Sequence, residues 1–234
     1  MPLLDVRNVS RRFGGIVAVN DLSFDAQRRK ITALIGPNGA GKTTVFNLIT
    51  RLYRPDAGEI AFDGESLLRT PAHRIVGRGI ARTFQNVELF GSMTVLEHVL
   101  VARRQRRGRS AREILGYVGL VANAHRLARE LPYGVQKRVE LARALASGPR
   151  LLLLDEPAGG LDHEEVAQLA GLIRRLRDDF ELTILLVEHH MELVMGVAER
   201  VHILDFGRRI ASGTPAEVQR EPAVIEAYLG TAHV

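Results

Sequence analysis

A glycine-rich run that contains one lysine and ends on two threonines carries the clearest chemistry in this sequence. The run follows an apolar segment, residues 31–35, with the pattern of a buried strand, and leads into residues 44–49, which have a helical pattern. Glycines let successive backbone N–H groups turn inward around an anion, and a helix start adds free N–H donors. The pattern predicts a phosphate-binding loop made of Gly36, Pro37, Asn38, Gly39, Ala40, Gly41, Lys42, Thr43 and Thr44.

The residue types in this loop indicate what it would bind. The Lys42 ammonium should reach the terminal phosphates of a nucleotide, and the Thr43 hydroxyl should hold Mg²⁺. A purely structural glycine turn is the alternative interpretation. The strand–turn–helix context, together with both Lys and Thr, favours the phosphate site.

Two adjacent acids form a second candidate site. Asp155 and Glu156 follow the apolar run 151–154. Ligands gather at the carboxyl ends of strands in α/β sheets, so Asp155 is expected to bind Mg²⁺, directly or through water. Glu156 is placed to polarise an attacking water. A solvated strand end also carries acids, but the four preceding leucines argue against a surface strand.

A histidine pair follows a third apolar run, residues 183–187. His189 could reach a γ-phosphate and hold the attacking water or Glu156 in place. A lone His after a strand is more often structural, but its order after the other two motifs strengthens the assignment. His190 is expected in the first turn of the next helix. The pair does not indicate metal, because adjacent residues point apart and no third ligand is evident from the sequence.

Composition places the chain among ordinary globular proteins. It has 234 residues, 46% hydrophobic and 25% charged, with no cysteine and a net charge of +5. No apolar run approaches the roughly 18 residues of a membrane span. The one dense basic run, Arg103–Arg109, has no interleaved aromatic residue, so nucleic acid is not expected as a partner. The run is interpreted either as a solvated turn between helices or as a contact for anionic lipid headgroups.

Strand and helix patterns alternate along the chain, which predicts an α/β fold with a mainly parallel sheet. Strands are expected at residues 3–9, 21–25, 31–35, 58–64, 79–84, 151–154, 183–187, 201–204 and 209–211. Helices are expected at residues 71–77, 94–104, 111–119, 134–146, 163–179, 215–220 and 223–229. The helical stretch near residues 87–147 predicts a lobe inserted into the core.

The ordered set of motifs resembles the ATP-binding subunits of ABC transporters along essentially the whole chain. Residues 131–136 stand where that family has its signature sequence, residues 82–85 resemble its glutamine loop, and residues 159–162 resemble its D-loop. A narrower resemblance, to the ATPases of high-affinity branched-chain amino acid importers, rests on residues 13–20, 82–85, 93–95, 213–215 and 227–230.

The resemblance implies a P-loop NTPase fold of the ABC ATPase type, with an antiparallel β subdomain and an inserted α-helical lobe. It implies a single ATP-binding domain over residues 1–234. Within it, the core comprises residues 1–86 and 148–234, the helical lobe residues 87–147, and a C-terminal helical tail residues 213–234.

The resemblance also implies roles for individual residues. Phe13 would stack on adenine, although an ordinary core aromatic is the alternative, and Val19 would line the ribose. Gln85 would sense Mg²⁺ and the attacking water and couple the site to the helical lobe. In a dimer, Asp162 would contact the other subunit, and the Gly134 N–H would bind the γ-phosphate held by that subunit.

The signature sequence departs from the family pattern. Pro132 stands where the family usually has Ser, Tyr133 where it usually has Gly, and Val135 where it usually has Gln or Glu. Proline has neither a hydroxyl nor an N–H. We therefore expect a weaker contact with the γ-phosphate across the dimer than in a consensus signature.

By the same resemblance, ATP and Mg²⁺ are the expected cofactors, and the expected location is peripheral, on the cytoplasmic face of the cell membrane. The expected partners are a second ATPase subunit (a paralogue or a second copy), integral membrane permeases and, indirectly, an extracytoplasmic solute-binding protein.

The alternatives to a branched-chain amino acid importer are the ATPase of a urea or amide importer or of a lipopolysaccharide exporter, and a soluble cofactor-assembly ATPase. A nucleotide-binding regulatory module without turnover is disfavoured by Glu156 and His189.

Overall fold

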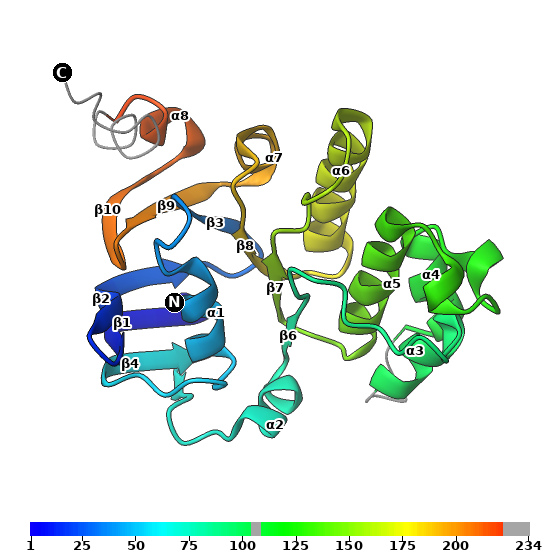
Figure 1. Cartoon of the computed structure of the whole chain (residues 1–234), viewed down its shortest axis with the longest axis horizontal. Coiled ribbons are helices and arrows are strands. Elements are labelled where there is room, and N and C mark those ends of the chain that lie inside the picture. Colours follow the sequence, from blue (N-terminus) through cyan, green and yellow to red (C-terminus); the bar gives the residue numbers. More distant parts are fainter. Residues whose placement is uncertain (104–108, 222–234) are drawn as a thin grey trace.

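The computed structural model describes residues 1–103 and 109–221 and contains two β-sheets with helices packed around them (Figure 1). The six-stranded sheet has the order β10-β9-β3-β8-β7-β6. All neighbouring strands in it are parallel except β9 and β10, which form an antiparallel edge. The strands are β3 (Ile31–Ile35), β6 (Ile80–Arg82), β7 (Leu151–Asp155), β8 (Thr183–Val187), β9 (Arg200–Asp205) and β10 (Arg208–Gly213).

The strands β3, β7 and β8 are buried along their whole length, because both faces of this sheet are covered. Alternate side chains of β7 enter two different cores. Leu152 and Leu154 pack with the helices on one face, whereas Leu151 and Leu153 pack toward the antiparallel sheet on the other. The continuous apolar runs in the sequence are therefore the mark of strands at the centre of a covered parallel sheet.

The second sheet is antiparallel and lies at the lower left of Figure 1, beside the parallel sheet. Its strands, in the order β2-β1-β4-β5, are β1 (Leu4–Phe13), β2 (Ile16–Ala26), β4 (Ala57–Phe62) and β5 (Glu65–Ser66). The expected strand at residues 21–25 is too short: β2 begins at Ile16, because a turn through Gly14, at φ +55°, pairs Phe13 with Ile16.

Among the described residues between β6 and β7, at the right of Figure 1, the α-helices are α3 (Val95–Ala102), α4 (Ala111–Tyr117) and α5 (Tyr133–Ala146). The helices packed nearer the sheets are α1 (Lys42–Ile49), α2 (Ala72–Ile75), α6 (His163–Asp179), α7 (Met191–Val197) and α8 (Pro215–Val218). Within the part of the chain that the structure describes, α3, α4, α6 and α8 begin with a reciprocal capping box. It is formed by Thr94, Ser110, Asp162 or Thr214 with the Glu three residues later.

This architecture confirms the predicted fold class, a mainly parallel α/β core with an antiparallel sheet and a helical insertion. The division into a core, a lobe at 87–147 and a tail at 213–234 stays a prediction. The expected helix at 223–229 lies outside the described residues, as does most of the basic run at 103–109. None of the helices in the described ranges is long and apolar enough to cross a membrane.

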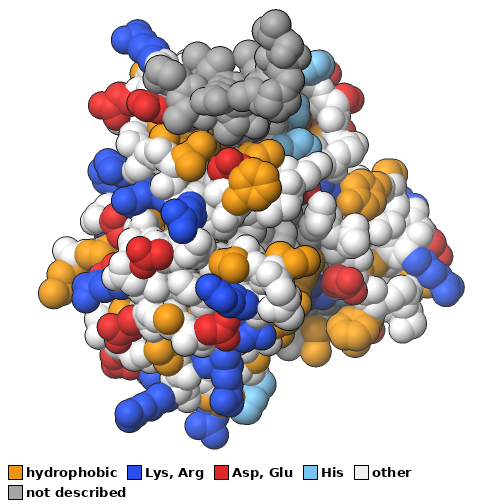
Figure 2. Space-filling model, turned by 60° about the vertical axis from the view of Figure 1, so that its left-hand side comes forward, with side chains coloured by type: hydrophobic (Ala, Val, Ile, Leu, Met, Phe, Trp, Pro, Cys, Tyr) orange, Lys and Arg blue, Asp and Glu red, His pale blue; other side chains and the backbone are white. Residues whose placement is uncertain are grey.

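The described end of the basic run packs against the body of the protein. The Arg109 guanidinium donates to the backbone oxygen of Asp179 at 2.7 Å and lies 4.2 Å from the centroid of the Phe180 ring. On the face shown in Figure 2, Lys and Arg side chains are interspersed with Asp and Glu among the side chains that are drawn in colour. This face therefore presents no single basic patch.

Candidate functional site

The topology brings the separate sequence motifs to one edge of the parallel sheet. The strands β3, β8, β7 and β6 are successive neighbours and run parallel, so their carboxyl ends lie side by side. The phosphate loop follows β3 and His189 follows β8. Asp155 ends β7, Glu156 comes directly after it, and Gln85 follows β6. The candidate site is assembled from these four strand ends.

The phosphate loop needs glycine because its backbone passes very close to neighbouring backbone. A Cβ on Gly36 would lie 2.1 Å from the Leu204 oxygen, and a Cβ on Gly41 would lie 2.4 Å from the Ala18 oxygen. Gly41 also has φ +99°, which an L side chain rarely adopts. These constraints fix the path of the loop into α1, whose first residue is Lys42.

The loop folds around its own lysine. Lys42 is 6% exposed, and its Nζ donates to the backbone oxygens of Gly36 at 2.6 Å and Pro37 at 2.9 Å. Burial lowers the pKa of Lys42, whereas the nearby carboxylates of Glu156 and Asp155 favour the charged form. The loop thus holds a shielded cation beside the two predicted acids, while the side chain of Thr43 is exposed.

The two carboxylate oxygens of Asp155 differ in their hydrogen bonds to the described residues. Its side chain is 2% exposed, and Oδ2 accepts a 2.7 Å hydrogen bond from Arg82 Nη2. Oδ1 is buried and has no hydrogen-bond partner among the described residues. Burial raises the pKa of Asp155, against the opposing effect of Arg82. A buried carboxylate oxygen without a hydrogen-bond partner suits a hard cation such as Mg²⁺.

Arg82 is a part of the site that sequence reasoning missed. Its Nη1 donates to Asn47 Oδ1 on α1 at 2.6 Å, so one guanidinium joins the helix after the phosphate loop to Asp155. The guanidinium carbon lies 5.4 Å and 5.0 Å from the ring centroids of Phe46 and Phe84. In the sequence, Arg82 is an arginine near the end of an expected strand. Its ion pair with Asp155 could not be predicted, because the two residues are far apart in the chain.

The structure brings Glu156, Gln85 and His189 together. Glu156 Oε2 accepts a 2.8 Å hydrogen bond from Gln85 Nε2 and lies 3.7 Å from His189 Nδ1. Glu156 also has φ +46°, a left-handed conformation that costs on the order of 1–3 kcal/mol for a residue other than glycine. Backbone strain of this kind persists where the surroundings fix the chain.

The surroundings that fix the loop after Glu156 are a buried lysine and a buried glutamate. Lys137 Nζ, from α5, donates to the backbone oxygens of Glu156 at 3.2 Å, Pro157 at 3.1 Å and Gly159 at 2.7 Å. Glu188 is fully buried, and its carboxylate accepts from the Ala158 N–H at 2.7 Å.

The same Glu188 carboxylate also holds the histidine loop. Its Oε2 accepts from the N–H groups of His189 and His190, both at 2.9 Å. Burial lowers the pKa of Lys137, and Glu188 has the largest opposing effect. Sequence reasoning missed both residues. The one available signal was that Glu188, a charged residue, directly follows the run Ile184–Val187 of four apolar residues.

A buried glutamate on α5 holds the segment around Gln85. Glu140 is 2% exposed, its Oε1 accepts from the Phe84 N–H at 3.1 Å, and burial raises its pKa. From the next turn of α5, Arg143 donates to the Glu88 backbone oxygen. Helix α5 therefore contacts both the segment after β6 and the loop after β7.

The remaining predicted residues lie on β1, β2 and α5 and at the start of α6. Phe13 is 36% exposed and packs edge-to-face against Tyr53, with ring centroids 5.0 Å apart. Val19 is fully buried in a core that also contains Ala40 of the phosphate loop and Val45 of α1, and its expected ribose contact stays a prediction. Gly134 lies in the first turn of α5, and Asp162 caps α6 by accepting from the Glu165 N–H at 2.8 Å.

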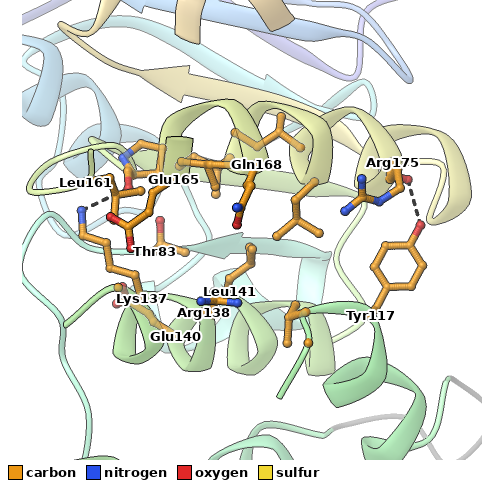
Figure 3. A pocket seen from close by; sticks show the side chains of 18 of the residues that line it. Thr83, Tyr117, Lys137, Arg138, Glu140, Leu141, Leu161, Glu165, Gln168 and Arg175 are labelled. Atoms are coloured by element: carbon orange, nitrogen blue, oxygen red, sulfur yellow. Dashed lines mark hydrogen bonds between the residues drawn. The ribbon is translucent and has the colours of Figure 1, made fainter. Parts of the chain in front are cut away.

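A cavity of about 270 Å³ separates α5 from α6 (Figure 3). Lys137, Glu140 and Leu141 line it from α5, and Glu165 and Gln168 line it from α6. No residue of the phosphate loop takes part in its lining. The contact between the helical insertion and the core is therefore incompletely packed close to the loop that Lys137 holds.

Comparison with known proteins agrees with this geometry. Residues 19–159 match the ABC transporter family, and residues 208–234 match the C-terminal family of branched-chain amino acid ATP-binding cassette transporters. The chain is 42% identical to the high-affinity branched-chain amino acid transport ATP-binding protein BraF of Pseudomonas aeruginosa and 44% identical to LivG of Salmonella typhimurium. Each alignment covers 99% of both chains.

Solved structures show the same fold. A nucleotide-free ATP-binding cassette from an ABC transporter matches with a TM-score of 0.89 and 28% identity, covering 98% of this chain and 100% of that one. The ADP conformation of an ATP-binding cassette matches with a TM-score of 0.88 and 28% identity, covering 98% and 99%. The chain therefore belongs to the ABC transporter family, as an ATP-binding subunit that hydrolyses ATP.

Proposed function

We propose that this chain powers the import of branched-chain amino acids, as the ATPase subunit of a transporter at the cytoplasmic face of the cell membrane. The proposal is supported by full-length similarity to BraF and LivG and by the C-terminal family match at residues 208–234. The observation that carries the enzymatic part is the cluster in which Gln85 donates to the Glu156 carboxylate beside His189.

In the proposed site, residues 36–44 bind the phosphates of ATP through their N–H groups, and Phe13 stacks on the adenine. The Lys42 ammonium, which donates to two carbonyls in its own loop, turns to the terminal phosphates. The oxygens of Thr43 and Asp155 hold Mg²⁺, with Gln85 as a further ligand. When bound, this cation would neutralise part of the negative charge of the phosphates. These donors fit it because Asp155 Oδ1 is buried without a partner among the described residues.

Glu156 is the proposed general base. Its carboxylate orients an attacking water and accepts the water's proton, while Gln85 and His189 hold the carboxylate in place. Lys137 and Glu188 fix the strained backbone at Glu156 and in the loop that follows it. The protein thus supplies positioning and charge stabilisation, which are the main requirements of phosphoryl transfer.

The proposed working unit is a dimer of ATPase subunits, formed with a second copy or a paralogue. Gly134 of one subunit donates its N–H to the γ-phosphate held by the other, and Asp162 contacts the opposite subunit. A dimeric structure of a bacterial ABC transporter cassette matches this chain with a TM-score of 0.80 and 26% identity, covering 91% of this chain and 98% of that one. This likeness supports the dimer.

Integral membrane permeases are the proposed partners of this dimer, with an extracytoplasmic solute-binding protein delivering the amino acid. We assign the docking surface to residues 86–90, where the core meets the proposed helical lobe at 87–147. Leu89 there is partly buried, whereas Phe90 is 57% exposed. Arg143 on α5 donates to the Glu88 backbone oxygen within this segment, and Glu140 accepts from the Phe84 N–H just before it.

Uptake in cells that lack the gene for this chain tests the proposal. We expect leucine uptake to fall to background, to return with the wild-type chain and not to return with Glu156→Gln. Lys30→Met, a change at an exposed lysine outside the site, serves as the matched control and should restore uptake. Normal leucine uptake without the chain would refute the proposed cargo. Loss of urea uptake or of lipopolysaccharide export in the same cells would identify the alternatives.

A further inference from the structure

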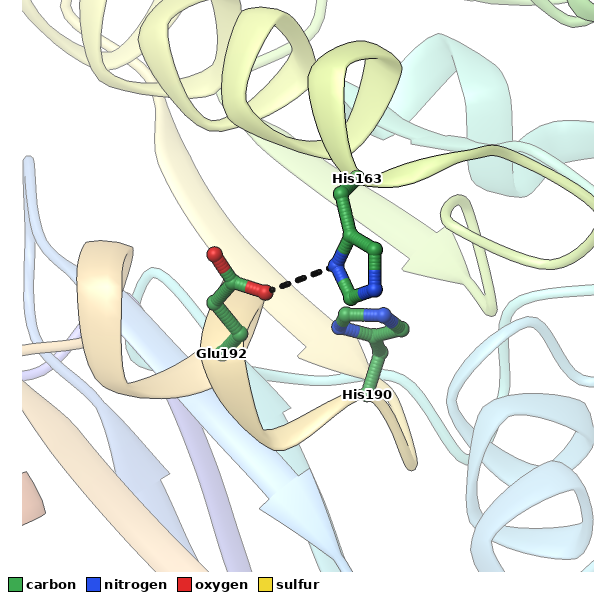
Figure 4. A group of neighbouring side chains, drawn as sticks. All are labelled: His163, His190 and Glu192. Carbon is green, nitrogen blue, oxygen red and sulfur yellow. Dashed lines mark hydrogen bonds and ion pairs between the residues drawn. The ribbon is translucent and has the colours of Figure 1, made fainter.

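Two histidines and a glutamate that the nucleotide site does not use meet at the starts of α6 and α7 (Figure 4). His163 is the first residue of α6, His190 directly precedes α7, and Glu192 lies in the first turn of α7. One ligand atom from each side chain lies within 4.8 Å of the others. In the sequence, the only histidine next to His190 is His189. His163 lies on a different helix, so the sequence gives no sign that it meets His190.

The geometry of the cluster is close to that of a metal site. His163 Nδ1 lies 3.4 Å from Glu192 Oε2, and the rings of His163 and His190 are 6.3 Å apart at 70°. Zinc binds nitrogen and oxygen at about 2.0–2.2 Å, so ligand atoms of a tetrahedral site lie about 3.3 Å apart. The side chains of His163 and Glu192 are 90% and 63% exposed, so they can rotate over the remaining distance.

A second observation points to a ligand. His190 Nδ1 is shielded from solvent and has no hydrogen-bond partner among the residues that the structure describes. The backbone N–H of His190 is bound by Glu188, so its loop is held in place. A neutral imidazole nitrogen with an unused lone pair, on a fixed backbone, is what a transition-metal ligand requires.

We propose that His163, His190 and Glu192 form a binding site for a divalent transition metal such as Zn²⁺ or Co²⁺. Two imidazoles and one carboxylate suit these ions better than Mg²⁺, which prefers an all-oxygen shell. Three protein ligands leave a fourth position for water. The bound ion ties the first turn of α6, which follows Asp162, to the start of α7, which follows His189. This inference does not depend on the identity of the transported compound.

Metal titration of the full-length, tag-free chain without nucleotide tests the site. Calorimetry with ZnCl₂ should show one ion bound, with a dissociation constant at or below about 10 μM. Co²⁺ should give the visible absorption of a tetrahedral site. His163→Ala and Glu192→Gln should each weaken binding at least about tenfold. His73→Ala, which removes an exposed histidine on α2, is the matched control and should change nothing.

Two outcomes would overturn the proposal. One is the absence of saturable Zn²⁺ binding below about 100 μM. The other is unchanged affinity in the His163→Ala/His190→Ala double variant, which would place the bound ion elsewhere, for example at Glu156 and His189. Zn²⁺ should also raise the melting temperature of the wild-type chain and of His73→Ala but not that of the double variant, since a ligand that binds only the folded state stabilises it.

Discussion

At the scale of single residues, Arg82 shows how a charge to which the sequence assigned no role supports the site. The side chains of Arg82 and Asp155 are 7% and 2% exposed and form a buried ion pair. Removing one partner of such a pair leaves the other charge buried and uncompensated, which costs about 3–5 kcal/mol. We therefore predict that Arg82→Met lowers the free energy of unfolding by about 3 kcal/mol in urea denaturation without nucleotide.

The Arg82→Met/Asp155→Asn double variant is the control, because it removes both charges. It should recover a large part of the lost stability. A loss of less than about 1 kcal/mol in Arg82→Met would show that the pair is not electrostatically coupled as its geometry indicates.

His202 gives the protein a predictable response to acid. The side chain is buried, its ring lies 5.5 Å from that of Phe24, and burial lowers its pKa from 6.5 to about 4. The unfolded chain therefore takes up a proton at a higher pH than the folded chain. The contribution of His202 to stability is present above pH 6.5 and is lost as the pH falls toward 4.

We predict that the wild-type chain loses about 2 kcal/mol more stability between pH 7 and pH 5 than His202→Gln, because only the wild type has this protonation. Urea denaturation of both proteins at the two pH values measures the difference. Equal pH dependence in the two proteins would contradict the prediction.

At the scale of elements, hydrogen bonds from α5 hold the loop that carries Glu156 in place. Lys137 is a positioning residue, since its ammonium contacts only backbone oxygens there. We predict that Lys137→Met lowers kcat about tenfold or more and leaves KM for ATP within about twofold, because misplacing a catalytic group affects the transition state more than binding. Lys30→Met is again the matched control. A rise in KM with unchanged kcat would instead assign Lys137 to nucleotide binding.

The start of α5 carries a second prediction. Pro132 precedes the helix without a side-chain capping bond and offers no hydroxyl toward a nucleotide on an opposite subunit. Pro132→Ser should strengthen ATP-driven association by about 1–3 kcal/mol if the new hydrogen bond is charge-assisted. Sedimentation at a series of protein concentrations measures this. No gain in association or in turnover would count against the proposed contact.

The elements could be predicted from the sequence where their signals are local. Helix α6 has the expected range because the capping box of Asp162 and the following apolar periodicity both lie within it. The phosphate loop is equally local, since glycines, lysine and threonine occupy one short run.

The contacts that hold the site could not be predicted, because they join residues far apart in the chain. Arg82 meets Asp155, Lys137 meets Glu156, and Glu188 meets Ala158 only after the strands have assembled. The burial of Val19 could not be predicted from the sequence either. The family resemblance gives this residue a ligand contact, and the structure adds that it is fully buried.

At the scale of the whole molecule, variants at the proposed docking surface allow ATP hydrolysis and transport to be tested separately. Leu89 and Phe90 lie in the segment that Arg143 attaches to α5. We predict that the Leu89→Asp/Phe90→Asp variant keeps the ATPase activity of the purified chain within about twofold and abolishes leucine uptake in cells, because charge disfavours an apolar protein contact. Normal uptake by this variant would place the permease contact elsewhere.

The central claim is that the phosphate loop binds Mg²⁺–ATP and that Glu156 drives its hydrolysis. Equilibrium ATP binding and single-turnover hydrolysis, measured side by side for the wild type, Glu156→Gln and Lys42→Ala, test it most directly. Glu156→Gln should bind ATP within about twofold of the wild type and hydrolyse it at least about 100-fold more slowly, and Lys42→Ala should lose binding. Hydrolysis by Glu156→Gln at the wild-type rate, or undiminished binding by Lys42→Ala, would contradict the claim.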